Sequence, residues 1–302
     1  MVKNLVLENV SVGFKLPQGV FYAVDDVSLN LHGGNFTAII GESGCGKSVL
    51  GQAILNILPS GVVKKGRVLY NGEQVKKILS AFGIIPQNPS ESLNPVRKIG
   101  KQMQDILAVH NITDGDNSYK KQCLRLFGLQ EAERVLAAYP HELSGGMLQR
   151  VLCAMPVSSK PEWILADEPT KGLDEQVGAV VRKNLLTIKQ DLRLSMLIIT
   201  HDIALAQEVC DDVLVMYAGQ VLEHNADIWH KPLHPYTKGF LQALPKNGLQ
   251  VIPGKAPVPG ESFTGCKFAA RCPYCTTRCK EEMPAMQQVG NAEVRCFLYA
   301  EG

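Results

Sequence analysis

The stretch GESGCGKS at residues 41–48 has the residue types and the spacing of a phosphate-binding loop. It fits the pattern G-x-x-x-x-G-K-[ST] at every specified position. The glycines let backbone N–H groups turn inward toward phosphates, and a following helix adds the positive end of its dipole. Lys47 is expected to contact the β- and γ-phosphates, and the Ser48 hydroxyl is expected to bind Mg²⁺. The motif therefore predicts a nucleoside triphosphate site.

An acidic pair in WILADEPT supplies the groups that hydrolysis needs next. Asp167 is the candidate carboxylate on the Mg²⁺ side, and Glu168 is the candidate base for the attacking water. An acidic pair at a strand end is as often a solvated turn or a helix cap. A phosphate loop whose metal ion needs a carboxylate favours the functional interpretation.

Three further polar sites follow predicted elements. Ser144, Gly145 and Gly146 in LSGGM can cap a helix and leave its first amides open, which makes a second anion site. Gln87 follows the run FGIIP, and His201 follows MLIIT. A histidine at a strand end is more often structural than catalytic. Both residues nevertheless follow strands at the edge where open α/β sheets gather their sites.

Short apolar runs predict the strands that position these residues. Runs of about five apolar residues without alternation are typical of strands buried on both faces. Helical stretches lie between these runs, and this alternation predicts a mainly parallel α/β sheet. The predicted strands are residues 36–40, 163–167, 196–200 and 213–217, and the predicted helices are residues 47–57, 176–191 and 202–210.

The remaining segments differ from this α/β pattern. Residues 5–31 alternate around the turn-forming PQG and predict an antiparallel hairpin. Residues 88–142 are polar and mostly helical, and they predict a helical subdomain inserted in a nucleotide-binding domain over residues 1–245. Residues 246–302 form a second region, in which a Pro/Gly-rich connector is expected to separate a cysteine-rich tail from the rest.

Five of the nine cysteines fall in the last 37 residues. Thiolates at such short spacing suit Zn²⁺ or an iron–sulfur cluster, although unrelated free cysteines would need no metal ion. Spacing alone leaves the four ligands open, because Cys275 could form a C-x-x-C pair with Cys272. A zinc knuckle for nucleic acid is disfavoured, because residues 245–302 carry seven Lys/Arg against five Asp/Glu. The five cysteines are Cys266, Cys272, Cys275, Cys279 and Cys296.

Composition says more about where the protein is located than about which partner it binds. A net charge of +2 over 302 residues provides no global field for nucleic acid or an anionic membrane. The N-terminus does not resemble a signal peptide, and no window reaches the roughly 18 consecutive apolar residues of a spanning helix. We therefore expect a cytoplasmic protein whose cysteines are not disulfide staples.

The ordered set of GESGCGKS, Gln87, LSGGM, LADEPT, an LD pair and His201 resembles the ATP-binding cassette subunits of ABC transporters. The resemblance covers residues 1 to about 245 and implies an ATPase, converting ATP and water to ADP and phosphate, that works as a dimer of cassettes with two nucleotides between them. It implies that Phe14 stacks on adenine. It also implies an ATP-binding loop made of Gly41, Glu42, Ser43, Gly44, Cys45, Gly46, Lys47, Ser48 and Val49.

The resemblance also implies roles for residues outside the loop. Gln87 would contact Mg²⁺ and report to a membrane subunit, and Glu168 would polarise the attacking water. His201 would hold the γ-phosphate, and Asp174 would contact the opposite subunit. The motif of Ser144, Gly145 and Gly146 would close on the γ-phosphate held by the partner cassette.

A narrower resemblance, to the dipeptide/oligopeptide/nickel import group, rests on IPQNPSESLNP, YPHELSGGMLQR, HKPLHPYTKGFLQALP and the tail. It implies two permease subunits, a second ATPase, an extracytoplasmic binding protein and a place on the cytoplasmic face of the membrane. The segments ILPSGV and SGGMLQR are more like nickel importers, so peptide and nickel stay open. The tail is similar to that of peptide members, which implies a [4Fe–4S] cluster rather than Zn²⁺ on Cys266, Cys272, Cys279 and Cys296, with Cys275 spare.

Two further observations bear on this interpretation. The rival hypothesis is a soluble ABC-type ATPase that acts on nucleic acid or ribosomes. The 95 residues between Ser48 and Ser144 are too few for the coiled-coil arms of DNA-acting relatives, and translation-type members usually carry two cassettes.

Pro156 departs from the family pattern, because it falls where the helix after LSGGM should continue and is expected to cost stability or kink that helix.

Overall fold

The computed structural model describes residues 3–17, 19–75, 81–86, 92–192, 194–244, 248–258 and 261–300. The chain divides into two compact units. The helical unit comprises residues 1–3, 32–36 and 78–209, and the P-loop unit comprises residues 4–31, 37–77 and 210–302. Each unit contains one part of the predicted nucleotide-binding residues.

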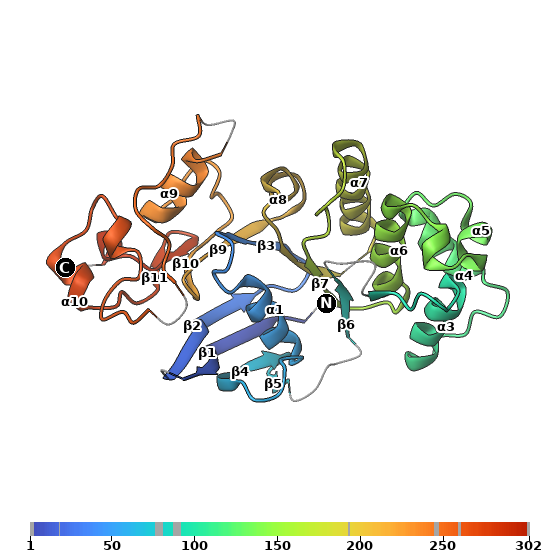
Figure 1. Cartoon of the computed structure of the whole chain (residues 1–302), viewed down its shortest axis with the longest axis horizontal. Helices are drawn as coiled ribbons and strands as arrows, with labels where there is room; N and C mark the ends of the chain where they lie inside the picture. Colours follow the sequence, from blue (N-terminus) through green and yellow to red (C-terminus); the bar gives the residue numbers. More distant parts are fainter. Residues whose placement is uncertain are drawn as a thin grey trace. The chain divides into compact units, whose positions relative to one another are not determined.

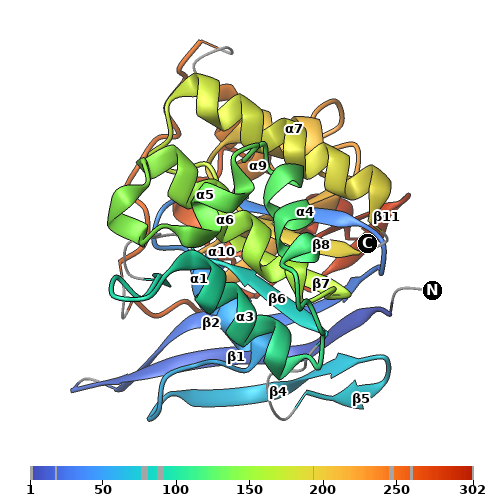
Figure 2. The same cartoon turned by 90° about the vertical axis from the view of Figure 1, so that its right-hand side faces the viewer.

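One sheet of the P-loop unit is antiparallel. Its strands β1 (Leu5–Leu16), β2 (Gly19–Leu31), β4 (Val63–Tyr70) and β5 (Glu73–Gln74) have the order β2-β1-β4-β5. The three long strands run side by side in Figure 2. Pairing of β1 with β2 confirms the hairpin predicted from the alternating pattern.

A second set of strands in the P-loop unit has the order β11-β12-β10-β9-β3 (Figure 1). Strands β3 (Phe36–Gly41) and β9 (Asp212–Tyr217) are parallel and buried along their whole length, as the continuous apolar runs predicted. The other members are β10 (Gln220–Asn225), β11 (Gln287–Val289) and β12 (Ala292–Val294). Helices α1 (Lys47–Leu55) and α9 (Pro235–Gln242) belong to the same unit.

The helical unit contains the parallel strands β6 (Phe82–Ile85), β7 (Trp163–Asp167) and β8 (Ser195–Ile199). Their parallel pairing confirms the predicted α/β arrangement. Helices α3 to α6 gather at one end of this unit in Figure 1, and α3, α4 and α5 lie within residues 88–142. The helices are α3 (Ile99–Val109), α4 (Ser118–Leu126), α5 (Ala132–Ala137), α6 (Gly145–Ser158), α7 (Glu175–Asp191) and α8 (Ile203–Val209), and η1 (Pro140–Glu142) is a single 3-10 turn.

Pro156 lies in the last turn of α6, so it does not interrupt a long helix as the sequence suggested. The helix ends two residues later, at Ser158, and the proline removes one hydrogen bond near a terminus. The hydroxyls of Ser158 and Ser159 donate to the carbonyls of Met155 and Pro156 at 2.6 and 2.8 Å and satisfy acceptors of that last turn.

The tail is not separated from the domain before it, contrary to the expectation from the Pro/Gly-rich connector. Strand β12 pairs with β10, so the β11–β12 hairpin extends the sheet of the P-loop unit. The Tyr299 hydroxyl also donates to the Leu233 carbonyl at 3.0 Å. The 3-10 turn η3 (Ala269–Arg271) and helix α10 (Thr277–Glu281) precede this hairpin, and the turn η4 (Phe297–Tyr299) follows it.

His224 joins the tail hairpin to the sheet. Its side chain is only 13% exposed, with Nε2 at 3.7 Å from Asp212 Oδ1 on β9 and Nδ1 at 3.3 Å from Glu293 Oε2 on β12. Burial alone would lower the pKa of His224, but the hydrogen bonds and charges of the two carboxylates outweigh it and raise the pKa to about 9. The histidine is therefore a cation between two acids at neutral pH.

We expect this cluster to make stability depend on pH. A pKa of about 9 in the folded chain exceeds the ordinary value of 6.5, so the stabilisation is complete below pH 6.5 and lost as pH rises through 9. As pH rises through this window, the free energy of unfolding of wild type should fall by on the order of 2 kcal/mol, and that of His224→Gln should not show this fall. Urea denaturation at each pH measures both. The exposed His32→Gln is the matched control. An identical pH slope in wild type and His224→Gln would contradict the assignment.

Candidate functional site

The glycine-rich loop between β3 and α1 has the backbone that the motif predicted. Gly46 has φ of +104°, and a Cβ there would collide with the Ala23 carbonyl oxygen. The Cys45 carbonyl accepts a hydrogen bond from the Gly219 N–H at 2.9 Å, so the turn between β9 and β10 holds the loop from one side. Glycine is required at position 46, since any other residue would have a strained positive φ and its Cβ would clash with the backbone of Ala23.

Lys47 lies within its own loop. Its Nζ donates to the carbonyls of Gly41 and Glu42 at 2.9 and 3.0 Å. Both acceptors lie at the start of the loop, so the ammonium closes the loop on itself. A phosphate that binds this ammonium competes with two neutral carbonyls, and a charged acceptor forms the stronger hydrogen bond.

In the helical unit, β7 ends at Asp167 and the next residue, Glu168, has a left-handed backbone with φ of +52°. The Glu168 N–H donates to the Ile199 carbonyl on β8 at 2.8 Å, which holds this conformation. A non-glycine residue there costs on the order of 1 kcal/mol, and such strain concentrates at functional sites.

This turn brings Glu168 and His201 together. Glu168 Oε2 lies 2.7 Å from His201 Nδ1 and also accepts from the His201 N–H at 3.4 Å. The glutamate side chain is 13% exposed, whereas the histidine is 65% exposed. The carboxylate is therefore oriented by a ring that solvent or a ligand can reach, which is the geometry of a base positioned beside its partner.

The two remaining predicted motifs of this unit are helix N-termini. The Ser144 hydroxyl caps α6 by accepting from the Met147 N–H at 3.3 Å. The Asp174 carboxylate caps α7 by accepting from the Val177 N–H at 2.9 Å. A Cβ on Gly146 would lie 3.3 Å from Val177, so the starts of α6 and α7 are adjacent.

The structure places the other candidates as follows. Phe14 is half-buried on β1 opposite Phe21 of β2. Gln87 lies outside the described residues. The loop residues and Phe14 belong to the P-loop unit, whereas Asp167, Glu168, His201, Asp174 and the glycines after Ser144 belong to the helical unit.

Four cysteines of the tail line one cavity of about 180 Å³. They are Cys266, Cys272, Cys279 and Cys296, and Cys275 is not among the residues that line it. The Cys266 N–H donates to the Cys279 carbonyl at 2.8 Å, which ties two of the four together. Among the described residues no three His, Cys, Asp or Glu side chains form a ready-made metal group. The thiols therefore surround a space without converging on one point.

The four thiols are close enough to affect one another. Burial is the largest cause that raises the pKa of the Cys266 thiol to about 11, and the charges of Cys279, Cys296 and Cys272 contribute to the same rise. Burial also raises the pKa values of Cys272 and Cys296. In the chain alone, these three thiols are therefore protonated at neutral pH.

Comparison with known proteins identifies the family. Residues 24–171 match the model of the ABC transporter family, and residues 222–279 match that of the oligopeptide/dipeptide transporter C-terminal region. The chain is 34% identical to the oligopeptide transport ATP-binding protein OppD of Haemophilus influenzae, with 98% of each chain covered. It is 36% identical to the dipeptide transport ATP-binding protein DppD of Escherichia coli, with 95% of this chain and 94% of the relative covered. The chain belongs to the ATP-binding subunits of ABC transporters.

The relatives place it in the oligopeptide/dipeptide import group, and it is an ABC ATPase that hydrolyses ATP to power transport. A solved structure of similar fold is a dimeric ATP-binding cassette in a post-hydrolysis state, bound to ADP and Pi. It aligns with a TM-score of 0.64 and 25% identity over 73% of this chain and 97% of that chain. No helix in the described part of this ABC ATPase has the length and apolar character needed to cross a bilayer.

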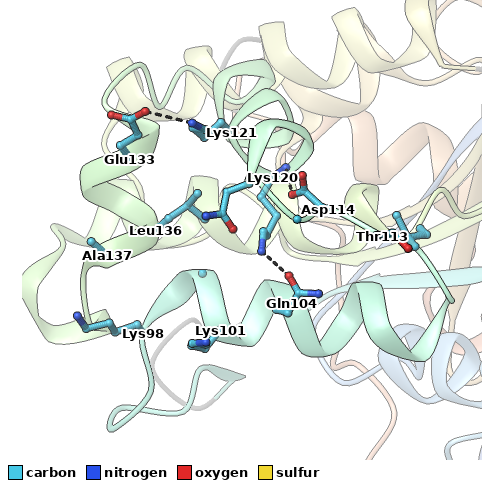
Figure 3. A pocket seen from close by; sticks show the side chains of 14 residues that line it. Lys98, Lys101, Gln104, Thr113, Asp114, Lys120, Lys121, Glu133, Leu136 and Ala137 are labelled. Atoms are coloured by element: carbon cyan, nitrogen blue, oxygen red, sulfur yellow. Dashed lines mark hydrogen bonds and ion pairs between the residues drawn. The ribbon is translucent and has the colours of Figure 1, made fainter.

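The ABC ATPase also has a basic cavity of about 700 Å³ among α3, α4 and α5 (Figure 3). Four lysines and two acids line it, and Lys121 pairs with Glu133 at 3.1 Å. Lys120 is only 3% exposed, and Figure 3 shows its ammonium directed from α4 to the neutral amide of Gln104 on α3. In the described part of the chain, Lys120 and Lys101 form no ion pair with a carboxylate. The cavity therefore has an excess of positive charge.

Two groups that no sequence motif indicated support the site. Gln149 of α6 is buried and donates from Nε2 to the Pro169 carbonyl at 2.8 Å, so the helix after LSGGM holds the loop after the acidic pair. Arg271 of the tail reaches the phosphate loop at Glu42. A polar residue on the apolar side of α6 is a local signal for the first contact, but no local pattern indicates the second.

Proposed function

We propose that this ABC ATPase powers the import of di- and oligopeptides rather than nickel. The observation that carries the choice of peptide is the match of residues 222–279 to the oligopeptide/dipeptide transporter C-terminal region, while the closed phosphate loop and the paired Glu168 and His201 support the ATPase activity. The nickel-like segments ILPSGV and SGGMLQR keep nickel as the rival substrate. The cassette does not hold the cargo, so the choice is tested by transport.

In this proposal the P-loop unit binds ATP. Phe14, near the C-terminal end of β1, stacks on adenine, and Lys47 leaves its two loop carbonyls for the β- and γ-phosphates. Amides of the loop and of the first turn of α1, other than those of Glu42 and Cys45, receive the remaining phosphate oxygens, because they lie at the N-terminus of α1. Ser48, Asp167 and Gln87 supply the oxygen ligands that Mg²⁺ prefers, and the ion would neutralise phosphate charge.

Hydrolysis is assigned to the turn after β7. Glu168 accepts a proton from water as the water oxygen attacks the γ-phosphorus, and the bond from that phosphorus to the leaving oxygen of ADP breaks. His201 holds the γ-phosphate from the other side of the carboxylate. The strained backbone of Glu168 and its contact with His201 Nδ1 support these roles, because both fix the direction of the carboxylate before substrate binds.

The working unit in this proposal is a pair of cassettes. The capped N-terminus at Ser144, Gly145 and Gly146 closes on the γ-phosphate of the opposite cassette, and Asp174 contacts the opposite subunit. The adjacent starts of α6 and α7 support this, since both motifs then face one partner. The related cassette solved with ADP and Pi is dimeric. The partner is a second ABC ATPase, either identical or different.

The basic cavity is proposed as the place where a permease subunit docks. Its exposed Lys101, together with the buried Lys120 whose ammonium donates to the neutral Gln104 amide, gives the cavity a positive charge that fits an acidic segment at a permease's cytoplasmic surface. Docking there would transmit movements of the helical subdomain at residues 88–142 to two permeases. It would place the ATPase at the cytoplasmic face of the membrane, opposite an extracytoplasmic binding protein.

The cysteine cavity is proposed to hold a [4Fe–4S] cluster. Four thiols around one space, with Cys275 outside it, fit the four-cysteine ligand set and favour Cys266, Cys272, Cys279 and Cys296 over a C-x-x-C pair that uses Cys275. Zn²⁺ would use the same thiolates and is the alternative. Because β12 anchors the chain before Cys296 and Tyr299 anchors it after, a cluster would stiffen the tail against the P-loop unit.

Glu168→Gln should stop turnover while ATP binding remains. Removal of a general base typically costs about 10² to 10⁴ in rate, and the neutral amide should trap an ATP-bound dimer visible by size-exclusion chromatography. In cells lacking the gene, wild type should restore uptake of a labelled dipeptide and Glu168→Gln should not. Glu175→Gln, which alters an 89% exposed residue at the start of α7, is the matched control. Unchanged turnover in Glu168→Gln would contradict the role of Glu168. If wild type restores nickel uptake but not peptide uptake, the peptide assignment is wrong.

Charge reversal in the basic cavity should weaken assembly with the permeases. Lys101→Glu removes one cation from the cavity and adds an anion, so less ATPase should co-purify with its permeases from detergent extracts. Lys183→Glu makes the same change on an exposed position of α7. Unfolding temperatures of both variants should match wild type. Equal recovery of Lys101→Glu, Lys183→Glu and wild type would exclude this cavity as the docking site.

The proposed ligand set includes Cys272 and leaves out the nearby Cys275, so variants of the two residues test it. Protein purified without oxygen should be brown and contain about four iron atoms per chain with equivalent sulfide. Cys272→Ser should lose most of the iron and the visible absorbance, whereas Cys275→Ser should keep both. Colourless wild-type protein with stoichiometric zinc refutes the cluster, and loss of metal in Cys275→Ser refutes the choice of ligands.

A further inference from the structure

Glu42, the second residue of the phosphate loop, is held by a side chain from the cysteine-rich tail. Arg271 Nη1 donates to both carboxylate oxygens of Glu42 at 3.1 Å. The Arg271 side chain is 7% exposed and that of Glu42 is 27% exposed. A charge-assisted contact so largely removed from water is stronger than a surface ion pair.

The guanidinium is itself fixed on several sides. Its Nη1 also donates to the Tyr217 hydroxyl at 3.3 Å, and its Nε donates to the Pro253 carbonyl at 3.1 Å. Its position is therefore set by the end of β9 and by the connector before the tail. Arg271 immediately precedes Cys272, one of the four cysteines that line the cavity.

A second group from the C-terminal half holds the backbone of the same loop residue. The Glu42 N–H donates to the Tyr236 hydroxyl at 3.1 Å. Tyr236 is fully buried, with ring centroids at 4.6 Å from Tyr217 and 5.4 Å from Phe268. A rigid aromatic cluster thus fixes the N–H of Glu42, while Arg271 fixes its carboxylate.

The third contact of Glu42 reaches the nucleotide-binding lysine. The Glu42 carbonyl accepts from Lys47 Nζ at 3.0 Å. The N–H, the carboxylate and the carbonyl of one residue therefore face Tyr236, Arg271 and Lys47. Any rotation of Glu42 that follows loss of Arg271 moves a carbonyl that binds the lysine.

We propose that Arg271 is a positioning residue for the phosphate loop, through which the tail sets how tightly ATP binds. It does not touch the nucleotide; it holds Glu42, and Glu42 holds the start of the loop and Lys47. The inference rests on ATP binding by this chain. It adds a residue outside the nucleotide-binding motifs to the groups that determine ATP affinity.

The test compares ATP binding with turnover. Arg271→Ala should raise the Kd for a fluorescent ATP analogue and the KM for ATP roughly tenfold, as expected for loss of a hydrogen bond to a charged group, with kcat changed less than about twofold. Arg271→Lys keeps the charge but loses the guanidinium contacts, so its KM should lie between those of wild type and Arg271→Ala. A structural role in the tail alone would not produce this separation of KM from kcat.

Two further variants isolate the contact. Glu42→Gln removes the carboxylate from the loop side and leaves the tail unchanged, so it tests the proposal even if Arg271→Ala fails to fold. The double variant should bind ATP no more weakly than the weaker single variant, because both remove one interaction. Arg278→Ala is the matched control, since Arg278 also precedes a cavity cysteine but is 54% exposed and pairs with Glu282.

The outcomes distinguish this inference from the general function. A wild-type protein that neither binds nor hydrolyses ATP would overturn the ATPase assignment itself. A functional wild type with unchanged Kd and KM in Arg271→Ala and Glu42→Gln would overturn the positioning role alone. Additive effects in the double variant, or an equal loss in Arg278→Ala, would also overturn it.

Discussion

The phosphate loop must present several N–H groups to one anion. The loop conformation that does this depends on the contacts that hold Glu42. Its N–H, carboxylate and carbonyl contact Tyr236, Arg271 and Lys47 respectively. Backbone in such an open turn has few hydrogen bonds of its own, so neighbouring elements must supply them. The aromatic cluster and the tail arginine do this from one side, and the turn after β9 does it from the other through Gly219.

The turn after β7 in the helical unit fixes its polar side chain by backbone strain. Glu168 has a left-handed backbone that a glutamate alone would avoid, and its hydrogen bond to β8 keeps it there. The result is a carboxylate whose direction is set by His201 before any substrate arrives. Preorganisation of this kind limits the rearrangement that the reaction requires. The phosphate loop and the turn after β7 thus each hold a polar group in place at a cost in folding free energy.

The tail combines structural and chemical roles. Its hairpin extends the sheet through β10, its arginine reaches the loop, and its cysteines surround a cavity. A chain segment that supports a nucleotide loop cannot rearrange without consequence for that loop. The tail is therefore part of the P-loop unit in physical terms, although composition marks it as a separate region.

The local sequence pattern by itself determined which segments form strands and helices and which functional groups lie at their ends. Continuous apolar runs predicted the buried strands, and the spacing in GESGCGKS predicted the phosphate loop, because both depend on neighbours in the chain. Only the tertiary structure decided that Glu168 meets His201 across 33 positions and that Arg271 meets Glu42 across 229. Such contacts depend on strand order and on the return of the tail along the sheet. No periodicity within either segment specifies them.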